Sequence, residues 1–374
     1  MHSPKVSAEL QMLIDATLEN EPGERYSDLQ HINWKRIAKL AKWHQVRPSL
    51  FDFIPAERVP ESAVPFYQSL KEFALGQAVA NMAFLGLSVK LYDALQENGV
   101  PVFPMKGALW SWMLYKKPTN REFGDIDFFI ERSSVRKSLD ILAQYDFYPD
   151  KYRAYLLDQH EKDYLNTDYQ LPLVPADEHT LQSLEVQWSI SYPRYCYNLF
   201  WADLAGNMIS FKMMQRTVNV PNMENQLLMM VVHHGGVEQW DKLKYLGDFV
   251  RLLRKFAPQL DWAFIEAAAR SGSFYGLLVQ SLELVKVVSG ENYVSYLGPS
   301  ADQLRSAAFI TSTVGHWENA RPAPQTKTWQ IFSFNFKYRD GWECRLSLVK
   351  AHISYFLHWR LLVAKWKWYR KNCF

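Results

Sequence analysis

The sequence predicts an α+β protein in which helices precede and follow a short run of strands. Apolar residues recur at helical spacing up to about residue 98, strand-like runs fill residues 99–191, and helical spacing returns after Pro221. We therefore divide the chain into an N-terminal helical region (1–98), a core (99–191), a helical domain (192–318), and a linker with a basic aromatic helix (319–374).

The composition is that of a globular protein of two or three packed units, with 374 residues and 15% aromatic residues. Its 42 Lys and Arg against 39 Asp and Glu give a net charge of +3, which does not indicate a nucleic-acid-binding protein. Three cysteines without C-x-x-C spacing suit a reducing compartment. Acidic residues interrupt the first 20 residues, so we expect no signal peptide and a cytoplasmic protein.

Each element follows from the local pattern. Before residue 98, prolines interrupt the helices, and a long Ala/Leu-rich helix is expected over 73–95. The core should contain strands at 100–105, 125–131 and 181–190, and helices at 108–115 and from an N-cap at Ser133 to 144. Residues 163–173 are expected to pair with the last strand through a turn at 175–179.

The C-terminal half repeats the helical period. Four helices are expected at 223–234, 243–256, 262–270 and 275–288, joined by turns that contain Gly or Pro. Residues 319–329 have the composition of a linker, and a last helix is expected from 343 to about 370.

The acidic strand at 125–131 is the sharpest local feature. Residues two apart on a strand point the same way, so Asp125 and Asp127 should lie side by side while Ile126 and Phe128 face the core. Two neighbouring carboxylates repel each other, and a hard cation such as Mg²⁺ or Mn²⁺ relieves that repulsion while binding phosphate. A strand whose acids merely face water is the simpler interpretation of such a pair.

Two neighbouring features favour the metal and phosphate interpretation. Lys106 and Gly107 follow a strand and begin a helix, where free amides, the helix dipole and a lysine charge favour a phosphate group. Glu185 lies on a later alternating strand and is our preferred third carboxylate. Three other acids in turn-like sequence are alternatives for that position: Asp168, Asp177 and Glu178.

These residues resemble the DNA polymerase β type of nucleotidyltransferase, and in particular a group of uncharacterised bacterial nucleotidyltransferases. The resemblance rests on FPMKGALW at 103–110, Arg121 with DIDFFI at 125–130, and LEVQW at 184–188. It extends to an H-x-V-x-P-x-L element at 44–50 and to a helical tail with His234, Trp240, Leu243, Leu246 and Asp248.

The resemblance implies a small mixed sheet on which Asp125, Asp127 and Glu185 bind a pair of metal ions. Lys106 and Arg121 would neutralise the charge of a nucleoside triphosphate, and Gly107 would approach its phosphates. Such a site moves a nucleoside monophosphate to an acceptor and releases pyrophosphate. The acceptor, a small molecule, saccharide or protein, is not defined by the sequence.

Two departures from the family pattern leave other functions open. Gly107 is followed by Ala108, where a second glycine or a serine is usual. Gln187 stands where the group often has histidine; we expect it to hydrogen-bond at the nucleotide site, but it cannot act as a base. Both changes suit a degenerate nucleotide-binding or scaffold protein. A glycosyltransferase is a further alternative, because D-x-D also binds the diphosphate of nucleotide sugars.

Two remaining features have competing interpretations. His233 and His234 are adjacent and lack the i, i+4 spacing of a chelating pair, so we expect His234 to contact Asp248 or the substrate cleft. The basic aromatic stretch at 346–370 is expected to pack its rings on preceding helices while its charges reach solvent. Contact with an anionic membrane or stacking on nucleic acid are the alternatives.

Overall fold

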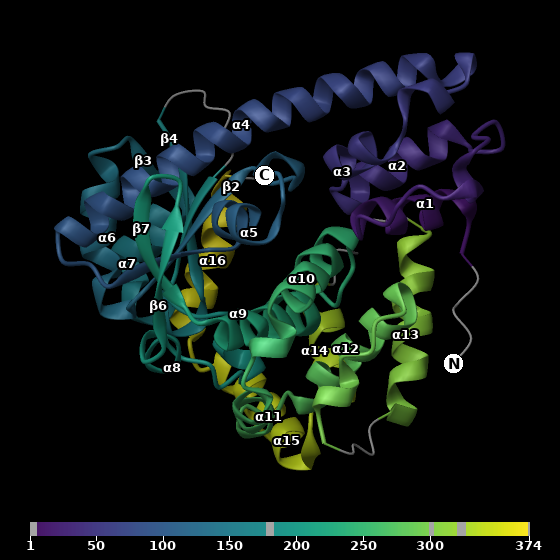
Figure 1. Ribbon diagram of the computed structural model, residues 1–374. Helices are drawn as coiled ribbons and strands as arrows, with labels where there is room; N and C mark the ends of the chain where they lie inside the picture. Colours follow the sequence, from purple (N-terminus) through teal and green to yellow (C-terminus); the bar gives the residue numbers. More distant parts are fainter. Residues whose placement is uncertain (1–5, 177–182, 299–302, 320–326, 373–374) are drawn as a thin grey trace.

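The computed structural model describes residues 6–176, 183–298, 303–319 and 327–372. A five-stranded sheet with its helices forms one side of the molecule, and most of the other helices lie beside it on the other side (Figure 1). One continuous cluster of buried apolar side chains runs from Leu10 to Ala364 and includes residues from all four predicted regions. The α+β class is confirmed.

The N-terminal region is helical, as predicted. It contains α1 (Ala8–Thr17), α2 (Trp34–His44), α3 (Arg47–Phe53) and α4 (Val64–Glu97). The side chains of Ser7 and Asn33 accept hydrogen bonds from first-turn amides of α1 and α2, which fixes where those helices begin. Proline at the first turn of α3 and of α4 suits a position where no backbone donor is needed.

Helix α4 is the longest described element, at 34 residues. Within the described part of the chain, only the stretch Glu61–Glu97 is long and apolar enough to cross a membrane, with a mean hydropathy of 1.3. A third of that window is buried inside the protein, and α4 packs on α3, β1 and α5. Core helices and signal sequences pass the same test of length and composition, so one such helix is weak evidence for a membrane span.

The main sheet is mixed and has the strand order β1-β2-β5-β4-β3. Its strands are β1 (Val102–Met105), β2 (Asp125–Ile130), β3 (Phe147–Pro149), β4 (Gln170–Pro175) and β5 (Ser183–Gln187). Only β2 and β5 pair in parallel, and they lie side by side at the centre. Helices α5 (Lys106–Leu114) and α6 (Val135–Ala143) belong to the same unit.

Two predictions within the core are wrong. Residues 163–167 form the end of helix α7 (Lys151–Thr167), so the partner strand β4 begins at Gln170. A 3₁₀ turn (Arg132–Ser134) precedes α6, whose N-cap is Ser134 without a side-chain hydrogen bond. Most of the turn predicted at 175–179 lies outside the described residues.

The region from 192 to 318 is mostly helical, but it also contains a hairpin that the sequence did not predict. Strands β6 (Met208–Met213) and β7 (Arg216–Pro221) pair antiparallel after the short helix α8 (Trp201–Ala205). The predicted helices follow as α9 (Met223–Met230), α10 (Leu243–Phe256), α11 (Trp262–Ser271) and α12 (Tyr275–Ser289), with α13 (Gln303–Trp317) after them. A π-helical segment, Val231–Val237, continues α9.

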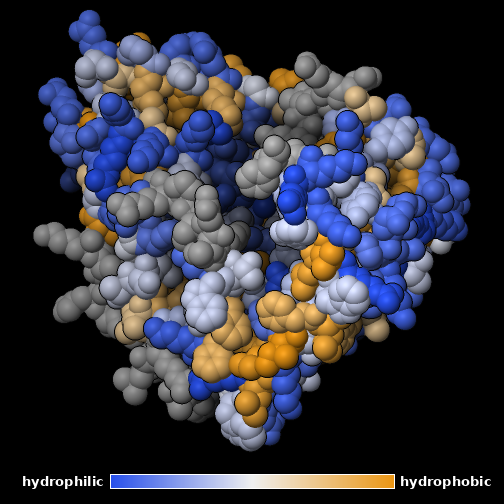
Figure 2. All heavy atoms as spheres, turned by 180° about the vertical axis from the view of Figure 1, so that it is seen from behind, coloured by the Kyte–Doolittle hydropathy of each residue, from blue (hydrophilic) through white to orange (hydrophobic). Residues whose placement is uncertain are grey.

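The predicted single last helix is divided into two helices, and a further helix precedes them, while residues 320–326 of the predicted linker lie outside the described residues. Helix α14 (Lys327–Tyr338) begins inside the predicted linker, and a break at 356–358 separates α15 (Gly341–Tyr355) from α16 (Trp359–Asn372). Figure 2 shows the face opposite to that of Figure 1, where orange and pale residues form a band along α15 and α16. The rings of this segment are therefore not all packed inside.

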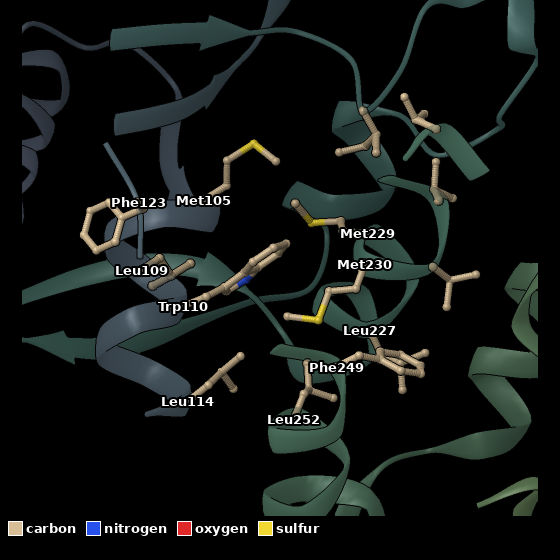
Figure 3. Close-up of a cluster of buried hydrophobic side chains, with 14 of the residues drawn as sticks. Met105, Leu109, Trp110, Leu114, Phe123, Leu227, Met229, Met230, Phe249 and Leu252 are labelled. Carbon is tan, nitrogen blue, oxygen red and sulfur yellow. The ribbon is translucent and has the colours of Figure 1, made fainter. Parts of the chain in front are cut away.

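Helix α5 joins the sheet to the helical domain. Trp110 is fully buried, and its indole Nε1 donates to Oε1 of Gln226 in α9 at 2.8 Å. Figure 3 shows Trp110 of α5 pointing toward Met229 and Met230, in an apolar cluster that also includes Phe249 and Leu252 of α10. Because these side chains pack closely, they fix the position of α9 and α10 relative to the sheet.

Candidate active site

A pocket of about 200 Å³ lies where the acidic strand meets the π-helical segment and α10. Seven of the eight site residues predicted from the sequence line it, and the eighth, Gln187, is fully buried beside it. The lining residues are Lys106, Gly107, Arg121, Asp125, Asp127, Tyr169, Gln170, Glu185, His233, His234, Glu238, Lys244 and Tyr245.

Strand register brings the three predicted carboxylates together. Asp127 of β2 is the direct partner of Glu185 on β5, and Asp125 precedes Asp127 by two residues on the same face. Ile126 and Phe128 are buried on the opposite face, as predicted. Asp127 is only 2% exposed, and this burial raises the pKa of its carboxyl well above the usual value; Lys106 opposes the shift, while Asp125 and Glu185 add to it.

Lys106 and Gln187 lie against these carboxylates. The Lys106 ammonium is 3.6 Å from Oδ1 of Asp127 and donates to Oε1 of Gln187 at 3.3 Å. The amide nitrogen of Gln187 donates to Oδ1 of Asp127 at 2.6 Å and to Oε2 of Glu185 at 3.0 Å. One side chain therefore connects a cation to two acids, and the buried charge of Asp127 is compensated within the protein.

The turn from β1 into α5 has an unusual backbone. Lys106 has a φ of 48°, in the left-handed region that side chains other than glycine rarely adopt, and such strain concentrates at functional sites. Gly107 packs against strand β2, where an added Cβ would lie 2.8 Å from the carbonyl oxygen of Asp125. No side chain caps the first turn of α5, so its leading amides remain available to a ligand.

Arg121 makes a buried ion pair with Asp248 of α10. Its Nε and Nη2 donate to the two oxygens of Asp248 at 2.9 and 2.8 Å, and both side chains are at most 4% exposed. Burial works to raise the pKa of the Asp248 carboxyl, but the Arg121 guanidinium holds it below its usual value. Tyr115 also donates to Asp248, at 2.9 Å. Arg121 lines the pocket, but its guanidinium forms its ion pair with Asp248.

His234 lies beside this ion pair, which confirms the contact expected from the sequence. Its Nε2 is 3.8 Å from Oδ2 of Asp248 and has no hydrogen-bond partner within the described residues. Burial lowers the pKa of His234 well below its ordinary value, so the ring is neutral at pH 7. Tyr245 stacks on it with ring centroids 4.4 Å apart.

Sequence reasoning missed Lys244, a cation in the first turn of α10 that faces the pocket. Burial lowers its pKa to about 8, the charges of Arg121 and Lys242 act in the same direction, and Asp125 and Asp248 oppose them. No local pattern marks this residue, because it lies about 120 positions from the acidic strand and reaches it only through the fold.

The alternatives for the third carboxylate do not replace Glu185. Asp168 is absent from the pocket lining, although its neighbour Tyr169 belongs to it. Asp177 and Glu178 lie outside the described residues. Glu185 is therefore the third acid that the described fold brings beside Asp125 and Asp127.

The carboxylates suit a hard divalent cation in their chemistry, because Mg²⁺ and Mn²⁺ prefer oxygen ligands. Within the described ranges, no three His, Cys, Asp or Glu side chains converge closely enough to hold an ion by themselves. Lys106 and Gln187 both approach Oδ1 of Asp127. The carboxylate oxygens are suitable ligands for such a metal. To bind one through Oδ1 of Asp127, the side chains of Lys106 and Gln187 would have to move away from that oxygen.

Comparison with known proteins assigns the chain to a family. A family model described as an uncharacterised nucleotidyltransferase matches residues 30–290. The chain belongs to this nucleotidyltransferase family. The match covers all the residues that line the pocket, and family membership supports a transferase.

Two further comparisons add little to the family assignment. A crystal structure of an antigenic nucleotidyltransferase-like protein from Paracoccidioides brasiliensis is similar to this chain at 15% identity. The similarity covers 57% of this chain and 93% of that one, with a TM-score of 0.29, which is too low to transfer any feature. No protein of curated function matches the chain.

Proposed function

We propose that this protein is a metal-dependent nucleotidyltransferase of the DNA polymerase β type. It would move a nucleoside monophosphate from a nucleoside triphosphate to an acceptor and release pyrophosphate. The observation that carries the proposal is the meeting of Asp125, Asp127 and Glu185 in one pocket with Lys106 and Lys244, in a member of a nucleotidyltransferase family. Carboxylates for metal and cations for phosphate are the two requirements of this chemistry.

Asp125, Asp127 and Glu185 would hold Mg²⁺ or Mn²⁺. When bound, the metal supplies positive charge for the attacking and leaving oxygens of the reaction. The acceptor oxygen forms a bond to the α-phosphorus while the bond between that phosphorus and the bridging oxygen breaks. Pyrophosphate takes the electron pair, and the acceptor proton passes to a carboxylate or to water.

Three groups of the chain would bind the triphosphate. When Lys106 no longer contacts Asp127, its positive charge would be available to phosphate at the N-terminus of α5, whose first-turn amides have no side-chain cap. Lys244 supplies a second charge from the other side of the pocket. We assign Arg121 a positioning role, because its guanidinium is paired with Asp248 and its Nη1 contacts the carbonyl of Gly107 at 3.4 Å.

A neighbouring cavity would admit the acceptor. It has a volume of about 360 Å³, lies between α13 and α14, and shares Glu238 with the nucleotide pocket. Gln239, which lines this cavity, and Trp240, which follows it, both have φ near 55°. Backbone strain of this kind is concentrated at functional sites.

A nucleotide-binding scaffold without activity is the second candidate, because Gln187 and Lys106 both contact Asp127, a carboxylate that would bind the metal. A glycosyltransferase is the third, and it differs in using nucleotide sugars. These alternatives require the same acidic pair, so binding alone does not separate them.

The test is to incubate the protein with Mg²⁺ or Mn²⁺, each α-labelled nucleoside triphosphate in turn, and a panel of acceptors. Wild type should transfer label and the Asp125→Ala/Asp127→Ala variant should not, while Asp140→Ala, an exposed acid on α6, should behave as wild type. Metal-dependent binding without transfer would favour the scaffold. Sugar transfer from a nucleotide sugar would favour the glycosyltransferase, and neither binding nor transfer would end the proposal.

A further inference from the structure

We propose that helices α15 and α16 form a docking surface for an anionic phospholipid membrane. We call this the C-terminal surface and define it as the exposed side chains of residues 341–372. The proposal is independent of the nucleotidyltransferase function, because none of these residues lines the nucleotide pocket.

Exposed apolar side chains are concentrated at this end of the molecule. Of the 21 large apolar residues that are exposed in the described chain, 11 lie between residues 329 and 369. All four exposed tryptophans are among them, and Trp342, Trp359 and Trp366 belong to the C-terminal surface. A contiguous apolar surface of this kind marks an interaction site, and tryptophan is enriched where proteins meet the lipid headgroup region.

The charge of the same segment is predominantly positive. Residues 341–372 contain one acidic side chain, Glu343, and seven basic ones: Arg345, Lys350, Arg360, Lys365, Lys367, Arg370 and Lys371. The whole chain has a net charge of only +3, so the remainder of the protein is net negative. Basic residues interleaved with exposed rings are the composition of helices that lie on anionic lipid surfaces.

The break between α15 and α16 brings three strongly exposed apolar side chains close together in the sequence. Phe356 is 68% exposed, Leu357 is 76% exposed, and Trp359 follows at 59%. Folded proteins rarely leave three large apolar residues together in water at a helix corner. Their position is that of a tip which enters the lipid while the flanking lysines and arginines reach the headgroups.

The surface is held in place by α7. Nδ1 of His358 is 2.9 Å from Oδ1 of Asp163, and Trp368 packs on Tyr152 and Tyr155 with ring centroids 5.8 and 5.2 Å apart. Leu361 is fully buried on the same side. One side of helix α16 therefore packs on the protein, and the other side faces solvent. Because the helix is already held in position, binding a membrane would require little further loss of conformational entropy.

Other occupants fit this surface less well. Stacking on nucleic acid would use the tryptophans and the charges, but it gives no role to exposed aliphatic residues such as Ile353 and Leu357. An apolar protein partner would use the rings but would have to cover seven cationic side chains. A membrane with anionic headgroups matches both components.

The test is sedimentation of the full chain with vesicles of phosphatidylcholine alone or with 30% phosphatidylserine. Binding should be at least tenfold stronger to the anionic vesicles and should weaken at high salt, because each basic residue near the surface contributes about fivefold. Lys367→Glu/Lys371→Glu should abolish the preference for anionic lipid. Phe356→Ser/Leu357→Ser should reduce binding more than tenfold.

Helix α4 provides the matched control. Leu75 and Val79 are 56% and 74% exposed, so Leu75→Ser/Val79→Ser removes the same kind of side chain from another face. This variant should bind anionic vesicles as wild type does. The proposal is overturned if wild type fails to bind them, if the α4 variant loses binding as the tip variant does, or if single-stranded RNA binds the surface and vesicles do not.

Discussion

Replacing Asp248 by asparagine tests how the helical domain holds the active site. Asp248 is fully buried and accepts from Arg121 through both oxygens, with a further bond from Tyr115. Asparagine has the same shape but no charge, so the Asp248→Asn variant leaves the Arg121 guanidinium buried without a counter-charge. Breaking a buried pair in this way costs about 3–5 kcal/mol. That is a large part of the about 5–15 kcal/mol by which a domain is stable.

The assay is urea unfolding followed by tryptophan fluorescence, with a double variant as control. Arg121→Met/Asp248→Leu removes both charges, so its cost should be at most about 2 kcal/mol, mainly from the unpaired Tyr115 hydroxyl. The pKa of Asp248 is depressed in the folded state, so its contribution is fully present above about pH 4. It is lost as pH falls further, and the difference between wild type and Asp248→Asn should shrink there.

Nucleotide binding by the same variant separates two roles for Arg121. If Arg121 positions the loop at Gly107, Asp248→Asn loosens that loop and weakens nucleoside triphosphate binding. If Arg121 instead binds phosphate directly, freeing its charge should strengthen binding. A stability loss below about 1 kcal/mol, or a double variant as unstable as the sum of its single changes, would refute the ion-pair reasoning.

Four other predictions concern the two cavities. Nucleotide binding should weaken between pH 7 and 9, because Lys244 has a pKa of about 8 and loses its charge there; fluorescence anisotropy should show a flat profile for Lys244→Arg. Gly107→Ala should lose about 1–3 kcal/mol in urea unfolding, because the added Cβ would lie 2.8 Å from a backbone carbonyl, while Gly86→Ala, with open space, should not be destabilised. Lys106→Met should bind Mn²⁺ more tightly and nucleotide more weakly by calorimetry, and a change of both in one direction would contradict its role as internal cation. Ser333→Trp should fill the acceptor cavity and block transfer while nucleotide binding persists; unchanged transfer would place the acceptor elsewhere.

Local sequence was sufficient where one pattern determined the structure. The strand at 125–130 alternates acid and apolar residues, and the helix at 243–256 has an apolar stripe, so both were predicted almost to the residue. The hairpin of β6 and β7 was missed because its turn has Met214 in the left-handed region, with no Gly or Asn to mark it. The segment 163–167 was assigned to a strand although it completes a helix, because its polar residues have little periodicity of either kind.

Tertiary contacts determined what local patterns did not. Nothing in the sequence at 356–358 breaks a helix, since it contains neither Gly nor Pro, yet α15 ends there. His358 contacts Asp163 and Trp368 packs on α7, so the chain bends to make contacts with residues almost 200 positions earlier. Lys244 and Asp248 reach the pocket for the same reason. The packing of α10 determines the position of both side chains, and no neighbouring residue in the sequence indicates the role of either.

Gln187 is the departure from the family pattern that the geometry explains best. Its carbonyl oxygen accepts from Lys106 while its amide nitrogen donates to Asp127 and Glu185, so it bridges one cation and two acids at once. A neutral histidine has a single donor and a single acceptor nitrogen, so it could not donate to both acids. Glutamine at this position therefore holds Lys106, Asp127 and Glu185 in one hydrogen-bonded network. Under the proposed function, a metal ion bound to these acids would compete with this network, and the charge of Lys106 would then be available to phosphate.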